Sequence, residues 1–180
     1  MTDFDSTRRG FLGGAVGAAS LGMVGPAPAA PAAGELKLGV ASYSLRQFQR
    51  GLAIKMMQRL NVPCICIKEF HLPYSSTPEE LARGVKEFAK GGLKVVGGGV
   101  IYMQRDDDDD IRRYFDYAKA AGMPLIVIAP SHQNLPRVEK FVKQYDIPVA
   151  IHNHGPEDKE FPTPESVLKA IQGRDPRVGL

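Results

Sequence analysis

Short apolar runs alternate with amphipathic stretches along the chain from Glu35 onward. The apolar runs are rich in branched residues and end in polar residues or glycine, which predicts strands. We expect strands over residues 36–44, 63–70, 93–102, 124–130 and 147–151. Residues 178–180 predict the opening of a sixth strand. This alternation is typical of an α/β fold with a parallel sheet.

The amphipathic stretches predict five helices, because their apolar residues recur at helical spacing. We expect them over residues 46–60, 77–90, 106–121, 135–145 and 163–172. The second opens with Thr77-Pro78-Glu79-Glu80, which combines an N-cap, a proline at the first helical position and acids in the first turn. Residues 106–110 are all aspartate and lead into the third helix. Calcium binding is one interpretation, but the run lacks the interleaved spacing of a calcium loop, so helix capping is favoured.

Five β/α units and the start of a sixth strand fit two architectures. One is an open doubly wound sheet, and the other is a (β/α)₈ TIM barrel that is incomplete. A complete barrel takes about 250 residues, and this chain has 180 residues. Because the chain stops inside a strand-like run, we favour a C-terminally truncated barrel. Its first strand would lack one neighbour, so we expect an exposed sheet edge and low stability.

Residues 1–33 differ from the rest and are typical of an export signal. Arg8 and Arg9 precede Phe11-Leu12 and a charge-free run over residues 13–25, and a Pro/Ala tract with Ala-x-Ala sites follows. Paired arginines followed by Phe-Leu resemble the twin-arginine signal. The apolar run is too short and too rich in glycine for a membrane span. We expect the twin-arginine translocase to export the protein to the periplasm, leaving residues 34–180 as one domain without a membrane span.

Composition narrows the choice of partners. Hydrophobic residues make up 43% and charged residues 24%, the net charge is only +3, and the basic residues are dispersed, so we expect no nucleic-acid partner. A bridge between Cys64 and Cys66 would be strained. We interpret them as buried thiols, with a Cys-x-Cys metal site as the alternative. The three glycines at 97–99 lack the spacing of a phosphate loop and predict close packing.

The sequence over residues 147–155 holds the first candidate site. An apolar run is followed at once by His152, Asn153, His154 and a glycine. Residues just past the carboxyl end of a parallel strand lie on the ligand-binding face. The two histidines are two positions apart and therefore point to the same side of a strand, where they could converge on one ion or substrate. The alternative is that both are hydrogen-bonded polar residues closing a strand.

Four motifs point to a known family. They are Ile-Lys-Glu-Phe-His-Leu-Pro at 67–73, the Thr-Pro-Glu-Glu helix start, Val-Ala-Ile-His-Asn-His-Gly at 149–155 and Phe-Pro-Thr-Pro-Glu at 161–165. Together they resemble the xylose isomerase-like TIM barrel family of sugar phosphate isomerases/epimerases, over about residues 36–180. The resemblance implies proton abstraction next to a carbonyl of a sugar. A keto-sugar lyase or dehydratase and a non-catalytic carbohydrate-binding barrel are alternatives, while weak positive charge argues against an endonuclease-type barrel.

The resemblance also implies one divalent ion, Mn²⁺, Mg²⁺, Co²⁺ or Zn²⁺, which stabilises an enediolate as a Lewis acid. The usual fifth-strand pattern is Glu-Asn-His, so His152 stands where a carboxylate is expected. An imidazole there removes a negative charge and favours Zn²⁺ or Mn²⁺. Alternatively, Glu157 or Glu160 supplies the carboxylate. We expect His152 and His154 to form part of a metal site whose other ligands lie beyond Leu180. The full-length protein is then expected to be the active enzyme, and the truncated chain to be inactive.

The remaining candidate residues follow other strands. Glu69 is the candidate for holding or deprotonating substrate, with an ion pair to Lys68 or to a loop arginine as the alternative. Lys68 and His71 are candidates for hydrogen bonds to sugar hydroxyls or a carboxylate. Further residues expected to bind substrate are Tyr43, His132 and Asn153. A homo-oligomer is left open.

Overall fold

The computed structural model describes residues 37–180. The predicted export signal lies outside the described residues. Six parallel strands form a single sheet in the order β1-β2-β3-β4-β5-β6. The strands are β1 (Gly39–Ala41), β2 (Cys64–Ile67), β3 (Lys94–Met103), β4 (Ile126–Pro130), β5 (Val149–Ile151) and β6 (Val178–Gly179).

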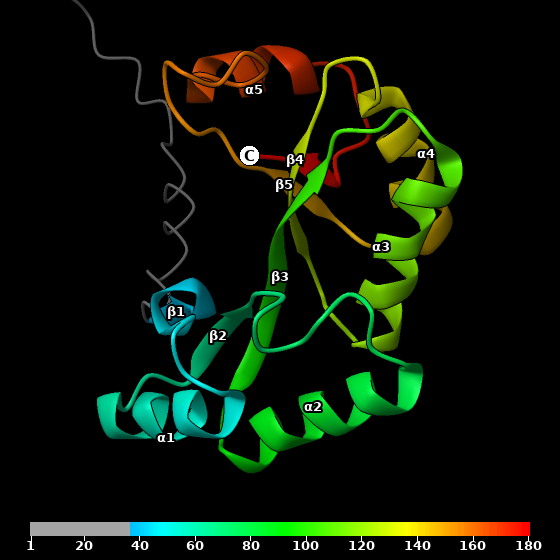
Figure 1. Ribbon diagram of the computed structural model, residues 1–180. Helices are drawn as coiled ribbons and strands as arrows, with labels where there is room; N and C mark the ends of the chain where they lie inside the picture. Colours follow the sequence, from blue (N-terminus) through cyan, green and yellow to red (C-terminus); the bar gives the residue numbers. More distant parts are fainter. Residues whose placement is uncertain (1–36) are drawn as a thin grey trace, which may run out of the picture. The chain divides into compact units, whose positions relative to one another are not determined.

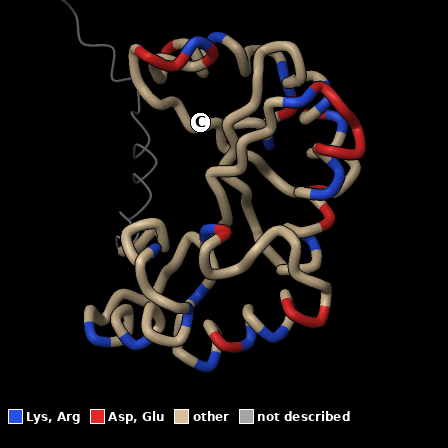
Figure 2. The backbone as a smooth tube through the Cα atoms, viewed as in Figure 1, with Lys and Arg blue, Asp and Glu red and all other residues tan. Residues whose placement is uncertain are grey.

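Helices connect successive strands and lie around the outside of the sheet, in order from α1 to α5 (Figure 1). A 3₁₀ helix, η1 (Ser42–Leu45), follows β1 directly. The α-helices are α1 (Arg50–Leu60), α2 (Pro78–Lys90), α3 (Asp108–Ala120), α4 (Leu135–Tyr145) and α5 (Pro164–Ile171). Each α-helix contributes buried apolar residues to the core. Most charged residues lie along the helices (Figure 2).

The strand order decides between the two architectures predicted from the sequence. A doubly wound sheet reverses its strand order at a switch point, whereas the order seen here follows the chain without reversal. The fold is therefore the α/β fold of a (β/α)₈ TIM barrel, represented by five β/α units and β6. Among the described residues, β1 pairs only with β2 and β6 only with β5.

The first two strands are shorter than expected. The strand expected over residues 36–44 is reduced to β1, because the chain turns into η1 at Ser42. The next helix begins at Arg50 rather than Arg46. The strand expected over 63–70 ends at Ile67, because a turn follows in which the N–H of His71 donates to the Lys68 carbonyl at 3.0 Å.

The N-terminal caps read from the sequence for α2 and α3 are confirmed. Thr77 accepts the Glu80 N–H at 3.3 Å while the Glu80 side chain accepts the Thr77 N–H at 2.9 Å, forming a capping box. Asp107 caps α3 by accepting the Asp110 N–H at 2.8 Å. The neighbouring Asp108 pairs with Arg137 and Lys140 of α4. The aspartate run therefore caps and anchors α3, as favoured over calcium binding.

The glycines of β3 are also explained by packing. A Cβ atom on Gly97 would lie 3.1 Å from the Leu125 carbonyl oxygen, and one on Gly98 would overlap the Met123 side chain. Gly99 has φ +115° and leaves no room for a Cβ beside the Val127 carbonyl. Close approach of β3 to β4 thus requires the glycine run.

The core lies between the sheet and the helices and includes the fully buried rings of Phe88, Phe115 and Phe141. Both cysteines are free thiols, with Cys64 buried and Cys66 half-buried. Among the residues that the structure describes, no helix is long and apolar enough to cross a membrane.

Candidate functional site

A cavity of about 400 Å³ lies at the carboxyl ends of the strands. This volume is within the usual range of small-molecule sites, about 300–1,000 Å³. Residues from four strands and the segments that follow them line it: Ala41, Tyr43, Lys68, Glu69, Phe70, Tyr74, Val100, Tyr102, His152 and His154.

Five of the residues predicted from the sequence meet in this cavity. Tyr43 comes from η1, Lys68 and Glu69 from the turn after β2, and His152 and His154 from the segment after β5. Two backbone contacts fix these segments. The buried Ser42 hydroxyl accepts the Lys68 N–H at 2.8 Å, and the His152 N–H donates to the Ile128 carbonyl at 2.9 Å, which extends the pairing of β5 with β4.

His154 is held by contacts on both ring nitrogens. Its Nδ1 lies 2.8 Å from a carboxylate oxygen of Asp158, and its Nε2 lies 3.3 Å from the Tyr102 hydroxyl. The His154 and Tyr102 rings also stack, with centroids 5.8 Å apart and planes 21° from parallel. His152 packs edge-on against His154 at a centroid distance of 4.7 Å. The two imidazoles therefore lie next to each other, while their convergence on one ion or substrate stays a prediction.

Asp158 is fixed in turn by the backbone that follows it. Its other carboxylate oxygen accepts the N–H groups of Glu160 at 2.8 Å and Phe161 at 3.1 Å. Burial alone would raise the pKa of Asp158, but these N–H donors and His154 lower it below its usual value. An ionised Asp158 accepts a hydrogen bond from an Nδ1–H group of His154. In that tautomer the lone pair of Nε2 is directed at the Tyr102 hydroxyl.

Burial and neighbouring charges shift the pKa values of two side chains in the cavity, His152 and Lys68. Burial lowers the pKa of His152, and the nearby His154 and Lys68 lower it further, so this imidazole is neutral near pH 7. Burial also lowers the pKa of Lys68 from its ordinary value, against the opposing effects of Cys66 and Glu69. Within residues 37–180, neither Lys68 nor Glu69 forms an ion pair within 4.0 Å. The ion-pair alternative for Glu69 is thus not observed.

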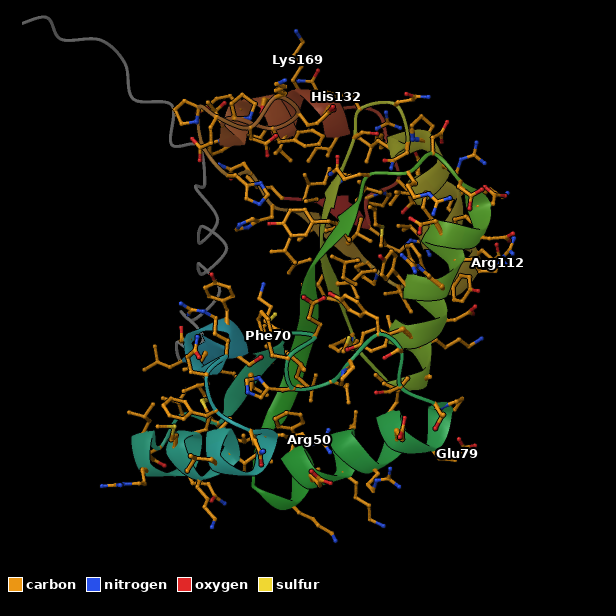
Figure 3. The ribbon with its side chains drawn as sticks, viewed as in Figure 1. Arg50, Phe70, Glu79, Arg112, His132 and Lys169 are labelled. Atoms are coloured by element: carbon orange, nitrogen blue, oxygen red, sulfur yellow. The ribbon has the colours of Figure 1, made fainter. Side chains whose placement is uncertain are left out.

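Other predicted residues lie outside the cavity. His71 is buried, and its Nε2 lies 3.0 Å from the Phe48 carbonyl, so it joins the loop before α1 to the turn after β2. His132 lies next to α5 (Figure 3), where its ring contacts the Glu160 carbonyl at 2.8 Å and packs on Phe161. Asn153 is half-buried and, one position from each histidine, does not line the cavity.

The alternative carboxylates line a neighbouring cavity of about 340 Å³, together with Tyr102 and His154. Glu160 already accepts the His132 N–H at 2.6 Å. Glu157 lies in the same loop and forms no hydrogen bond among the described side chains.

Sequence reasoning missed four cavity-side residues: Phe70, Tyr74, Tyr102 and Asp158. Phe70 and Tyr102 are the last residues of the strands predicted over 63–70 and 93–102, and could have been found from that position. Asp158 gave no signal, since a loop and not a regular element brings it to His154.

The described residues do not form a complete metal site. Within residues 37–180, no group of three or more His, Cys, Asp or Glu side chains is placed to hold a metal ion. His152 and His154 offer two imidazole nitrogens, and Nε2 of His154 already faces Tyr102. A complete site for a divalent ion usually has at least three protein ligands, and bound water fills the remaining positions.

The chain has a TIM-barrel fold with a cavity at the carboxyl ends of its strands. No protein-family model matches the sequence, and no curated protein matches it either. Solved structures share its fold. An uncharacterised protein from Parabacteroides distasonis ATCC 8503 is 24% identical with a TM-score of 0.68, over 80% of this chain and 61% of that one.

Two further solved structures belong to the xylose isomerase-like TIM barrels. A xylose isomerase domain-containing protein from Salmonella typhimurium LT2 is 12% identical with a TM-score of 0.61, over 75% of this chain and 56% of that one. A D-psicose 3-epimerase, solved in the presence of D-fructose, is 15% identical with a TM-score of 0.61, over 78% of this chain and 61% of that one. The chain therefore spans about 60% of the length of these structures and has their fold.

Proposed function

We propose that this chain belongs to an exported sugar isomerase or epimerase that abstracts a proton next to a carbonyl. The observation that supports it best is the meeting of Lys68, Glu69, His152 and His154 in one cavity. These residues come from distant parts of the chain and lie on the face where barrel enzymes place their catalytic groups. The epimerase and the xylose isomerase domain protein among the fold relatives agree with this choice.

In this proposal Glu69 takes the proton from the carbon beside the carbonyl. A carboxylate without an ion-pair partner is free to act as a base. Lys68 is placed beside it and donates a hydrogen bond to the carbonyl oxygen as negative charge develops there. His152, neutral near pH 7, and His154 bind hydroxyl groups of the sugar.

A divalent ion, when bound, would supply a Lewis acid for the developing oxyanion. His152 and His154 would provide part of its ligands. Binding is tested by titrating Mn²⁺, Zn²⁺, Co²⁺ and Mg²⁺ into the full chain and into the double variant H152A/H154A. We expect the double variant to lose the binding of the tightest ion.

Exchange of substrate protons with solvent tests the reaction. The full-length protein is incubated in D₂O with D-psicose or D-fructose, with each divalent ion and with EDTA, and deuterium in the sugar is followed by NMR. We expect deuterium at the carbon beside the carbonyl and a loss of about 10²–10⁴-fold in Glu69→Gln. Glu79→Gln, an exposed carboxylate at the start of α2, is the control (Figure 3). Absence of exchange with every ion would reject the proposed reaction.

A non-catalytic carbohydrate-binding barrel is the second candidate. It is favoured by His152 in place of the carboxylate of the family pattern and by the incomplete ligand set among residues 37–180. Sugar binding without any proton exchange would support this candidate.

Export is proposed from Arg8 and Arg9, which lie outside the described residues. Replacing both with lysine should leave the protein in the cytoplasm, which cell fractionation measures. Unchanged export of that variant would contradict a twin-arginine signal.

A further inference from the structure

The cavity that contains Glu157 and Glu160 lies next to the candidate site and shares two side chains with it. It has a volume of about 340 Å³, and Tyr102 and His154 line both cavities. The residues that line only this second cavity are Gln104, Ala129, Pro130, Glu157, Asp158 and Glu160. They lie at the ends of β3 and β4 and in the segment after β5. The proposed reaction takes place in the first cavity and gives the second cavity no role.

The two shared side chains are fixed and are not covered by other residues. The rings of Tyr102 and His154 stack at a centroid distance of 5.8 Å, and Asp158 holds Nδ1 of His154. Tyr102 is nevertheless 60% exposed. A ligand that lies against the exposed part of the Tyr102 ring therefore reaches both cavities without displacing a side chain.

The second cavity contains hydrogen-bond acceptors that are held in place and remain available. The amide nitrogen of Gln104 donates to the Ala129 carbonyl at 2.8 Å, which fixes the side chain and leaves its amide oxygen as an acceptor. The Glu157 carboxylate lies against Gly155, where a Cβ atom would come within 3.0 Å of a carboxylate oxygen. Acceptors that are already ordered bind a ligand with a smaller loss of conformational entropy.

These acceptors limit the chemistry of a ligand. Three carboxylates and no lysine or arginine side chain line the second cavity, so a phosphate ester would be repelled. Within residues 37–180, the carboxylates are not grouped so that they could hold a metal ion together. Hydroxyl groups fit this cavity, because each hydroxyl donates one hydrogen bond to a carboxylate or amide oxygen. A neutral sugar unit presents several such donors.

We propose that the two cavities together bind a neutral disaccharide or glycoside. The reacting sugar occupies the first cavity, and the second sugar unit occupies the cavity with Gln104 and Glu157. This inference rests on the proposed function, in that the reacting unit is a carbohydrate, and it names the substrate class. Gln104 and Glu157 are then specificity-determining residues, because they contact only the second unit.

Disaccharides that carry D-fructose at the reducing end test the proposal. Lactulose, turanose and isomaltulose join a second hexose to D-fructose at different positions and so vary the direction of the second unit. Binding of each, and of D-fructose alone, to the full-length protein is measured by NMR titration. We expect at least one disaccharide to bind at least about tenfold more tightly than D-fructose, because its additional hydrogen bonds include one to a charged group. The backbone amide signals of Gln104 and Glu157 should shift with that disaccharide and not with D-fructose.

Variants of the second cavity are compared by the ratio of disaccharide affinity to D-fructose affinity. Glu157→Gln removes a charged acceptor and should lower this ratio by about tenfold, and Gln104→Ala should lower it by about fivefold. Glu79→Gln, at an exposed carboxylate of α2, is the matched control for Glu157. Gln58→Ala is the control for Gln104, because the Gln58 side chain also donates to a backbone carbonyl. Gln104 and Glu157 are exposed, so all variants should melt close to the wild type.

The outcomes distinguish this inference from the proposed function. Equal affinities for D-fructose and all the disaccharides, or an unchanged affinity ratio in the double variant E157Q/Q104A, would overturn the second sugar position and leave monosaccharide binding in place. Tighter binding of D-fructose 6-phosphate than of every disaccharide would also overturn it. Failure of D-fructose, D-psicose and all the disaccharides to bind would overturn both proposals.

Discussion

Replacing Asp158 with asparagine should change the proton position on His154 without unfolding the loop. Asp158 accepts three hydrogen bonds, from the His154 ring and from the N–H groups of Glu160 and Phe161. The asparagine oxygen can still accept both backbone N–H groups. Its nitrogen, however, must then face Nδ1 of His154 and donate to it. The neutral imidazole would therefore move its proton to Nε2 and lose the lone pair that it directs at Tyr102.

The two substitutions at Asp158 should differ in cost. A hydrogen bond to a charged group contributes about 1.5–3 kcal/mol, and less where solvent reaches it. Asp158→Ala loses all three bonds, so we expect the free energy of unfolding to fall by roughly 2–4 kcal/mol. Asp158→Asn keeps two bonds in neutral form and should cost about 1 kcal/mol. The control Asp116→Asn removes the same charge from the exposed face of α3, where the carboxylate accepts a bond from Tyr145.

Nitrogen-15 NMR of the imidazoles at alkaline pH reports the tautomer directly, and urea denaturation gives the stability. In the wild type, the His154 signals should show a proton on Nδ1, and in Asp158→Asn a proton on Nε2. Affinity for any divalent ion bound at His154 should fall by about 10–100-fold. An unchanged tautomer in Asp158→Asn would refute the assigned role of Asp158, whatever the stability change.

Three further predictions concern stability. Gly99→Ala should destabilise the protein by more than about 3 kcal/mol in thermal melts, because it combines an unfavourable φ with a clash on the Val127 carbonyl. Gly122 has φ +62° but open space around it, so the control Gly122→Ala should cost only about 1 kcal/mol. Lys140 and Arg137 lower the pKa of Asp108 to about 2. The contribution of Asp108 to the free energy of unfolding is therefore present above the pKa of the unfolded chain and is lost as pH falls from about 4 to 2. Asp108→Asn should lack this loss when stability is measured over the same pH range. His71→Ala should lower the free energy of unfolding by about 2–4 kcal/mol, because His71 is buried and bonded to the Phe48 carbonyl, and a melt equal to the wild type would contradict this placement.

Much of the fold could be predicted because local patterns decide it. Both ends of the helix over residues 135–145 were predicted correctly, because its apolar spacing and its flanking residues indicate the same bounds. The capping boxes at Thr77 and Thr163 are also local signals. The first strand was overestimated because Ser42 turns away from the strand to accept the Lys68 N–H, a contact between residues 26 positions apart. Such a contact leaves no trace in local periodicity.

The sequence predicted only those residues of the candidate site whose position follows from the end of a strand. Strand ends converge on one face of a parallel sheet, so Glu69, His152 and His154 could be placed from their positions alone. Strand position does not decide where a loop directs its side chains. His71 and His132 also follow strands, but their loops turn one ring into the protein and the other onto Phe161.

The curvature of the sheet, more than any single side chain, creates the cavity. Ala41 and His152 line the same cavity although β1 and β5 are four strands apart in the sheet. Neighbouring strands lie about 4.8 Å apart, so in a flat sheet these two strands would be separated by roughly 19 Å. The register shifts of β3 against β2 and β4 fall at and beside the glycine run, which allows the sheet to bend there. The glycine run, which the sequence explained by close packing alone, thus helps Tyr43 and Phe70, which follow β1 and β2, to line the same cavity as the histidines after β5.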